Sequence, residues 1–382
     1  MISKILLEWF YCHKRNLPWR HSYNPYEVWI SEIMLQQTQI DRVIPFFNHW
    51  MERFPNLAEL TEASEEEILK LWEGLGYYSR ARNILKAAKQ LVHMGYSTVP
   101  PDEAVLRKLP GIGAYTAGAI LSIAYNLPFP AVDGNVRRVF ARLFNIDMPV
   151  ISGMGLDLLN NYVLSTLPSE NARDFNQSVM ELGALVCIPR SPRCPLCPLQ
   201  KFCQAFQEGE QNNRPITNKK AGIQKKKAVA GIFYCDKFIL LRQRETDGSW
   251  GGLWEFPWGF EHDDLAAEEV LMKEIDKVLG TASFTLRSLG RVRHSIMNTQ
   301  IDLNGYVASL PSLVHVETPF KWVMPKELSK LPLQGGSAKL LHLFIKKAGP
   351  PLLKGCHMKI SKVLRRNLFR QKKCFPHFQS EP

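Results

Sequence analysis

The first half of the chain repeats apolar residues with the period of an amphipathic α-helix. Apolar side chains recur three or four positions apart in segments 25–54, 64–75, 79–95, 102–125, 132–144 and 171–187. Ser64 and Glu67 have capping-box spacing, and Gly95 is placed to end the helix that precedes it. Residues 1–185 are therefore predicted to form a succession of helices.

Beyond residue 227 the pattern becomes that of strands with one helix. The segments that carry it are a hairpin over 228–245 turning at 235–237, a helix over 267–280, and strands over 301–310 and 320–325. The polar, lysine-rich stretch between the two patterns predicts a linker. We therefore expect a mainly α domain (1–207), a basic linker (208–227), a small α+β domain (228–348) and a disordered basic tail (349–382).

Composition narrows the class of partner. The chain has 382 residues, which suits about two domains, and a net charge of +12, which favours an anionic partner such as nucleic acid or a membrane surface. No stretch approaches the roughly 20 apolar residues of a membrane span. The apolar run at the N-terminus is interrupted by Glu8 and is too short for a signal peptide. We expect a cytoplasmic protein that does not bind membranes.

Four of the eight cysteines lie in one short stretch with the spacing C-x6-C-x2-C-x5-C: Cys187, Cys194, Cys197 and Cys203. The other four are scattered singly, so the pattern favours a metal site in a reducing compartment over disulfides. Zinc sites commonly contain two close C-x2-C pairs, whereas this stretch has one. The spacing favours an iron–sulfur cluster and leaves structural zinc open.

Residues 109–120, "LPGIGAYTAGAI", place Gly111 and Gly113 in a turn between two helical patterns. Such a turn lets backbone N–H groups approach a phosphate, although a plain helix–helix turn has the same pattern. An acidic residue, Asp133, lies twenty residues after Gly113, within "VDGNVRR". An aspartate before a glycine is also a common helix cap.

A second acid, Glu32, stands in the apolar segment "VWISEIML". If it is buried there, desolvation raises its pKa and makes it a proton donor near neutral pH. If it faces water, it is an ordinary helix glutamate. Together, Glu32 and Asp133 fit a chemistry in which one carboxyl protonates a leaving group and the other stabilises an oxocarbenium-like centre.

The segment "WGGLWEFPWGF" contributes Trp250, Trp254 and Trp258, which suit base stacking or, more commonly, a core. The metal-binding signature of Nudix pyrophosphatases needs a glutamate six residues after its first glycine. Leu265 holds that position after Gly259, and no R-E-x-x-E-E run follows. The C-terminal domain therefore lacks that metal site.

These residues together resemble the MutY-type adenine DNA glycosylases of the helix-hairpin-helix superfamily, which also includes endonuclease III. The motifs that carry the resemblance are "LPWR", "SEIMLQQTQ", "LWEGLGYYSRARN", "LPGIGAYTAGAI", "VDGNVRR", "ELGALVC" and the cysteine spacing. The resemblance implies a helix-hairpin-helix glycosylase domain with an iron–sulfur loop over 187–203, and a Nudix-like C-terminal domain. It also implies a [4Fe–4S] cluster on the four clustered cysteines.

The resemblance further implies roles for individual residues. Glu32 stands where the family has its proton donor, and Asp133 where it has the carboxylate that stabilises the sugar cation. Asn135 and Tyr115 match residues that support this chemistry. The positions that match duplex wedges and pocket walls are Gln37, Tyr77, Trp19 and Arg20.

The chain departs from the family in the C-terminal domain. The family reads 8-oxoguanine through a Phe-Ser-His loop placed shortly after an Arg-His pair. Here Arg293 and His294 are followed by Ser295, Ile296, Met297 and Asn298. The alternative is that the loop lies slightly later, at Asn298–Gln300. Discrimination of 8-oxoguanine from guanine is therefore expected to be weaker than is usual in the family.

The implied activity is monofunctional hydrolysis of the N-glycosidic bond of adenine paired with 8-oxoguanine or guanine in double-stranded DNA. The protein is expected to be a nucleoid-associated monomer. Two alternatives are an endonuclease III-like glycosylase and lyase that acts on damaged pyrimidines, and a non-catalytic iron–sulfur DNA-binding protein. The presence of both Glu32 and Asp133 argues against the non-catalytic alternative.

Overall fold

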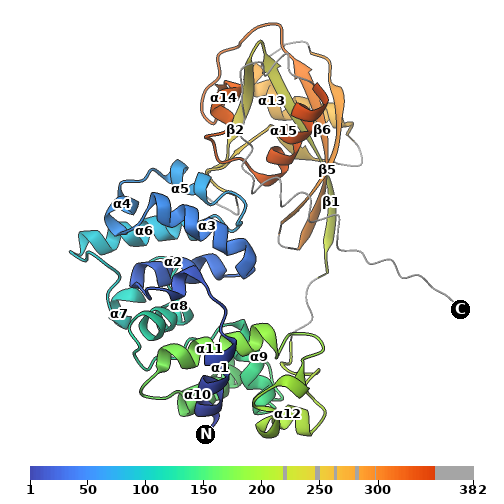
Figure 1. Cartoon of the computed structure of the whole chain (residues 1–382). Helices are drawn as coiled ribbons and strands as arrows, with labels where there is room; N and C mark the ends of the chain where they lie inside the picture. Colours follow the sequence, from blue (N-terminus) through green and yellow to red (C-terminus); the bar gives the residue numbers. More distant parts are fainter. Residues whose placement is uncertain (218–221, 246–249, 262–264, 280–283, 297, 349–382) are drawn as a thin grey trace, which may run out of the picture. The chain divides into compact units, whose positions relative to one another are not determined.

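Figure 1 shows the chain as a computed structural model that describes residues 1–382 apart from 218–221, 246–249, 262–264, 280–283, 297 and 349–382. The described residues fall into two compact units. The first contains residues 1–63 and 79–217, and the second contains 64–78 and the described residues from 222 onward. The predicted basic tail lies outside the described residues, and the domain boundaries given above stay a prediction.

The first unit is helical, as the periodicity predicts. Its elements are α1 (Ile2–His13), η1 (Pro18–Arg20), α2 (Pro25–Leu35), α3 (Ile40–Arg53), α4 (Leu57–Thr61), α6 (Ser79–His93), α7 (Glu103–Leu106), α8 (Ala114–Ala119), the π-helical η2 (Ile120–Ala124), α9 (Gly134–Leu143), α10 (Gly153–Thr166), α11 (Ala172–Leu185), η3 (Cys194–Leu196), η4 (Gln200–Phe202) and α12 (Gln204–Gln207). The second unit adds α5 (Glu65–Leu71), where Ser64 caps the backbone N–H of Glu67 as the sequence predicts.

The pattern over 25–54 forms two helices, α2 and α3, because the chain turns at Gln36–Gln39. Arg80, which is buried, donates to the carbonyls of Ile33, Met34 and Gln36. These bonds satisfy the last carbonyls of α2 and so end the helix there. Helix α2 itself is almost entirely buried, and Asn24 caps its N-terminus by accepting from Tyr26 N.

Helices α2, α8 and η2 share a small core made by Val28, Ala119, Ile123 and Ala131. Gly118 allows this close approach, because a Cβ there would lie 2.1 Å from the carbonyl oxygen of Pro130. The close contact places the C-terminal end of α8 beside the segment that leads into α9.

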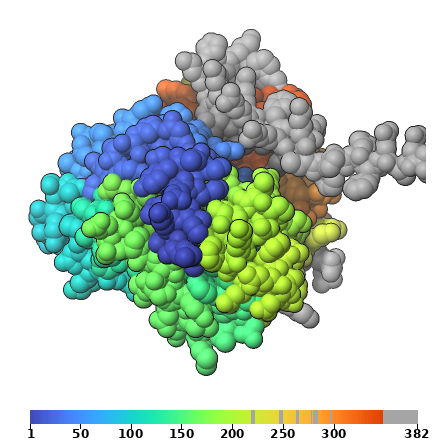
Figure 2. Space-filling model, turned by 60° about the horizontal axis from the view of Figure 1, so that its bottom comes forward, coloured from blue at the N-terminus to red at the C-terminus, as the bar shows by residue number. Residues whose placement is uncertain are grey.

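A second core joins α1, α9, α10 and α11 to the cysteine loop, residues 187–203. Leu6 of α1 is buried in one cluster with Phe140, Phe175 and Leu199, and three of the loop's cysteines pack against that cluster. Figure 2 shows the blue surface of α1 beside the yellow-green surface of this loop.

The C-terminal part of the second unit is a sheet with helices. Within the described residues the sheet has seven strands: β1 (Gln224–Cys235), β2 (Phe238–Gln243), β3 (Trp254–Glu255), β4 (Trp258–Phe260), β5 (Arg287–Ile296), β6 (Thr299–Ser309) and β7 (Phe320–Val323). Their order is β3-β2-β1-β6-β5, with β4 paired to β1 and β7 to β2. The β1–β6 pair is parallel, and the other pairs are antiparallel.

Helices cover both faces of this sheet. Ala228, Ala230 and Ile232 of β1 point into a core with α15 (Gly335–Ala348), whereas Val229 packs against α13 (Ala267–Leu279) on the other face. A short helix, α14 (Pro325–Leu328), precedes α15. The three tryptophans belong to the core or pack against it, as their more common role predicts.

The α+β fold of this unit is confirmed in most details. The β1–β2 turn lies at the expected place, and the helix over 267–279 and the strands β6 and β7 form as predicted. One difference is that β1 begins at Gln224, so the last four residues assigned to the linker are in a strand. These residues pair in register with Thr299–Asp302 of β6, and backbone pairing rather than an apolar pattern places them in the sheet.

Among the residues that the structure describes, no helix combines the length and the apolar character that a membrane crossing requires.

Candidate active site

Two carboxyls and one phenol meet where α2, α8 and α9 converge. Glu32 lies on α2 and is 5% exposed. Tyr115, in the first turn of α8, donates its hydroxyl hydrogen bond to Glu32 Oε2. Asp133 is the N-cap of α9, and its charge acts on both Glu32 and Tyr115. Of the two sequence readings of Glu32, the structure supports the buried one.

Burial is the largest cause that raises the pKa of Glu32, to about 7, and the charge of Asp133 raises it further. The hydrogen bond from Tyr115 and the charge of Arg20 act in the opposite direction and lower it. Burial also raises the pKa of Asp133, although hydrogen bonds from the start of α9 oppose this. A carboxyl with a pKa near 7 is protonated in a large fraction of molecules at neutral pH. The pair therefore offers a proton donor beside a second carboxylate.

Asp133 caps α9, which is one of the two roles that the sequence left open. Its Oδ1 accepts from Val136 N at 2.7 Å, which is the helix cap, and its Oδ2 accepts from Asn135 Nδ2 at 2.8 Å. Arg138 then donates to Asn135 Oδ1 at 2.8 Å and to the carbonyl of Cys187 at 2.7 Å. A chain of hydrogen bonds therefore runs from Asp133 to the cysteine loop.

Trp19 and Arg20, which the sequence predicts as a pocket wall, both lie in η1. Trp19 is buried and packs edge-on against Phe47. Arg20 donates from Nε to Gln177 Oε1 at 2.8 Å and from Nη2 to Glu181 Oε2 at 3.0 Å. Gln177 and Glu181 were not predicted from the sequence. They lie one helical turn apart on α11, on a face that also holds Arg173 and Asp174, so no local pattern distinguishes them.

The two predicted wedge residues have unusual backbone conformations. Gln37 follows α2 with φ of 56°, and Tyr77 follows α5 with φ of 50°. Non-glycine residues rarely adopt this left-handed region, and strain of this kind clusters at functional sites. Both side chains are exposed. They belong to different units of the structure.

The hairpin between α7 and α8 has the expected form. Gly111 has φ of +80°, which glycine adopts readily. Gly113 is the N-cap of α8, and a Cβ added there would meet no heavy atom within 4 Å. The backbone of this turn is therefore open to a close approach by another molecule.

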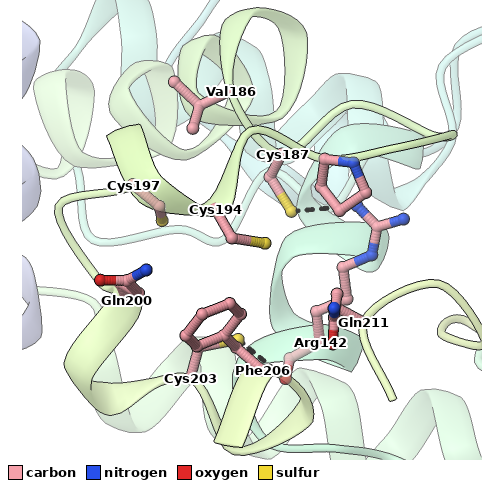
Figure 3. A pocket seen from close by; sticks show the side chains of 10 residues that line it. Arg142, Val186, Cys187, Cys194, Cys197, Gln200, Cys203, Phe206 and Gln211 are labelled. Atoms are coloured by element: carbon pink, nitrogen blue, oxygen red, sulfur yellow. Dashed lines mark hydrogen bonds between the residues drawn. The ribbon is translucent and has the colours of Figure 1, made fainter. Parts of the chain in front are cut away.

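The four clustered cysteines line one pocket, together with Arg142, Phe206, Gln211 and other residues of the loop and α9 (Figure 3). Buried Arg142 donates to Cys187 Sγ at 3.3 Å and to the carbonyls of Ile188 and Pro189. Burial raises the pKa of the Cys197 thiol to about 12. Across the described residues, no group of three or more His, Cys, Asp or Glu side chains forms a site for a single metal ion.

The predicted recognition segment falls at the turn between β5 and β6. The backbone of Ile296 pairs with that of Thr299, and Met297 lies outside the described residues. Ser295 pairs with Gln300 on the two strands. His294 packs against Trp250 at 5.2 Å between ring centroids, and burial lowers its pKa to about 4.

Comparison with known proteins gives the class first. The model of the "HhH-GPD superfamily base excision DNA repair protein" family matches residues 30–149, and that of the NUDIX domain matches 228–343. A solved structure titled as a thermostable thymine-DNA glycosylase is 26% identical with a TM-score of 0.50, covering 54% of this chain and 95% of that one. The helical unit is therefore that of a base excision DNA repair glycosylase.

Relatives then define the family. The adenine DNA glycosylase of Buchnera aphidicola subsp. Baizongia pistaciae is 39% identical over 267 residues, which is 68% of this chain and 74% of that protein. The adenine DNA glycosylase of Mus musculus is 31% identical over 400 aligned positions, covering 89% of this chain and 77% of that protein. The chain belongs to the adenine DNA glycosylase family.

Proposed function

We propose that this protein excises adenine that is paired with 8-oxoguanine or guanine in double-stranded DNA, by hydrolysing the N-glycosidic bond. The observation that carries the proposal is the buried Glu32, which accepts a hydrogen bond from Tyr115 and is influenced by the charge of the partly buried Asp133. Family membership supports the same activity.

The reaction uses the two carboxyls in different states. The adenine flips out of the duplex, because its glycosidic bond cannot be reached inside the stack. Glu32, whose pKa burial raises to about 7, gives its proton to the base from its protonated form. The bond from C1′ to the base nitrogen breaks, and the base leaves with the electron pair. The carboxylate of Asp133 stabilises the resulting sugar cation until water adds to C1′ and releases a proton.

Strand cleavage through a Schiff base is not part of the proposed activity. A lyase of this type needs an amine that attacks the sugar, and bifunctional relatives carry a lysine at the position held here by Tyr115. A phenol cannot form that imine. Arg138 lies near Asp133, but guanidinium groups stay protonated and are poor nucleophiles.

We propose a [4Fe–4S] cluster held by Cys187, Cys194, Cys197 and Cys203. A zinc site gathers four sulfurs about 2.3 Å from a single ion, whereas in a four-iron cluster each thiolate binds a different iron, so the sulfurs are spread more widely. The four cysteines line one pocket, and their spacing contains one close C-x2-C pair rather than the two that are common in zinc sites, which favours the cluster. The guanidinium of Arg142 would offset the charge of the Cys187 thiolate.

The cluster assignment has a direct chemical test. Protein purified without oxygen is expected to be brown and to contain iron and acid-labile sulfide in equal amounts, about four of each per chain. Zinc without iron or sulfide would contradict the assignment. Replacing Cys197 with Ser should reduce the iron content, while replacing the exposed, isolated Cys12 with Ser should leave it unchanged.

DNA contacts are proposed at four places. The hairpin at Gly111 and Gly113 grips the phosphates of one strand through backbone N–H groups, and the cysteine loop adds basic side chains. Gln37 and Tyr77 wedge into the duplex where the adenine leaves. The β5–β6 turn of the Nudix-like domain reads the opposite base through Ser295, Ile296, Met297 and Asn298, next to His294. We further propose that the protein acts as a monomer in the cytoplasm.

One assay separates this function from its alternatives. The protein is incubated in excess with duplexes that contain adenine opposite 8-oxoguanine, adenine opposite guanine, or thymine glycol. Release of adenine from the first two, with no strand cleavage before alkali treatment, is expected. Action on thymine glycol alone would favour the endonuclease III-like alternative, and binding without release of any base would favour the non-catalytic one.

A further inference from the structure

Helix α11 presents a buried carboxylate toward the start of the chain. Glu181 is 1% exposed and accepts four hydrogen bonds. Three come from Arg15, through its backbone N at 3.0 Å, Nε at 2.7 Å and Nη2 at 3.0 Å. The fourth comes from Arg20 Nη2 at 3.0 Å. Both oxygens of the carboxylate are therefore occupied by arginine donors.

Three N–H directions of Arg20 are fixed by this arrangement. Besides its bond to Glu181, Arg20 donates from Nη1 to the carbonyl of Arg15 at 3.0 Å and from Nε to Gln177 Oε1 at 2.8 Å. A guanidinium has only donors, so Gln177 must turn its oxygen toward Arg20. The orientation of this amide therefore depends on the position of the guanidinium.

Arg20 is also a charge that acts on Glu32. Glu32 is influenced by Tyr115 from α8, by Asp133 from α9 and by Arg20 from η1, and Arg20 is the cation among them. Burial raises the pKa of Glu181, but the Arg15 hydrogen bond and the charge and hydrogen bond of Arg20 outweigh this, and the pKa is lowered. Glu181 is therefore charged at neutral pH and able to hold Arg20.

We propose that Glu181 is a positioning residue for adenine excision, which fixes the guanidinium of Arg20 in the pocket wall beside Glu32. The inference rests on the proposed function and deepens it. A buried ion pair is a weak source of stability, because desolvation of the charges offsets their attraction. Its more distinctive effect is to set the orientation of the groups, and here the oriented group is Arg20.

Arg15 provides a matched control. It bonds the same carboxylate, but it is not among the groups that act on Glu32. Arg15→Met removes the side-chain ion pair and leaves intact the backbone carbonyl to which Arg20 donates. If Glu181 serves only stability, Arg15→Met should remove part of that stabilisation. Arg20 should keep its position in this variant.

The test is a double-mutant cycle on the single-turnover rate of adenine release from an A:G duplex with enzyme in excess. Glu181→Gln is expected to lower this rate on the order of tenfold, within the range of coupling between contacting residues. In an Arg20→Gln background the same change should have no further effect. Arg15→Met should lower the melting temperature but keep the rate within about threefold of the unaltered protein.

Additive losses from Glu181→Gln and Arg20→Gln, or an equal loss from Arg15→Met, would overturn the inference. If the Glu181→Gln protein does not fold, the Arg20→Lys variant is tested in its place. The lysine ammonium keeps the positive charge but lacks the planar fork of donors that holds Glu181 and Gln177 in a fixed geometry. A rate for Arg20→Lys equal to that of the unaltered protein would also overturn it. If the unaltered protein releases no adenine, the proposed function itself is wrong. That result differs from additive losses in the variants, which would contradict only the role of Glu181.

Discussion

Both units of the protein bury glutamates, and Glu255 of the second unit and Glu32 of the first are surrounded differently. Glu255, in the C-terminal sheet, is 0% exposed and accepts from Arg242, Arg244 and Trp258. Glu32, in the helical unit, is 5% exposed and accepts from Tyr115. Within the described residues no Arg, Lys or His lies at ion-pair distance from Glu32.

The difference shows how the same side chain becomes a structural or a chemical group. At Glu255 two arginines compensate the charge, so the carboxylate holds β2, β3 and β4 together. At Glu32 burial acts without an ion pair, and the proton is held up to about pH 7. What burial does to a carboxyl therefore depends on whether cations are buried with it.

Removing the acidic proton at Glu32 is expected to give the largest effect. Glu32→Gln keeps the size of the side chain but has no proton of suitable acidity, so the single-turnover rate should fall by about 10²–10⁴-fold. Affinity for an A:G duplex should change little, because phosphate contacts supply most of it. A near-normal excision rate would show that Glu32 is structural, like Glu255.

The matching change at Glu255 should act on stability. Glu255→Gln removes the carboxylate that pairs with Arg244 and leaves Arg242 with Glu274 alone, and breaking a buried pair in this way costs about 3–5 kcal/mol. Thermal unfolding followed by circular dichroism should show the C-terminal unit melting earlier. Glu32→Gln should cause no comparable loss. Equal melting temperatures for both variants and the unaltered protein would contradict the structural role assigned to Glu255.

Placing a cation beside Glu32 should make it resemble Glu255. In Tyr115→Lys an ammonium replaces the phenol and lowers the pKa of Glu32, so adenine release at pH 7 should slow. The new amine should also increase covalent trapping on DNA by borohydride. Tyr115→Phe is the control, since it removes the hydroxyl without adding an amine. Stoichiometric trapping of the unaltered protein would contradict the monofunctional assignment.

The smallest expected effect concerns the opposite base. A thioether at position 297 donates no hydrogen bond, and one lost bond to a buried base edge costs about 1–3 kcal/mol. Met297→Ser should therefore increase the preference for adenine opposite 8-oxoguanine over adenine opposite guanine, measured as a ratio of single-turnover rates and affinities. A strong preference in the unaltered protein that Met297→Ser does not change would place recognition elsewhere.

The sequence predicts the helical unit well, because amphipathic periodicity and capping residues such as Ser64 are local signals. It also identifies Glu32 and Asp133, since acids in apolar surroundings are conspicuous. It could not decide whether Glu32 is buried, because that depends on how α8 packs against α2.

Other parts depend on contacts distant in sequence. Glu181 and Arg20 are 161 positions apart, and no local pattern connects them. The strand at Gln224–Lys227 has polar side chains and forms through pairing with β6. The π-helical turn of η2, at the end of α8, likewise has no signal in the apolar period.

The central claim is that Glu32 acts as a proton donor because burial raises its pKa to about 7. The direct measurement is the single-turnover rate of adenine release from an A:G duplex between about pH 5 and pH 9. Since the protonated form is the active one, the rate should be level below the pKa and fall toward tenfold per pH unit above it. A rate that stays level or rises from pH 7 to pH 9 would contradict the account.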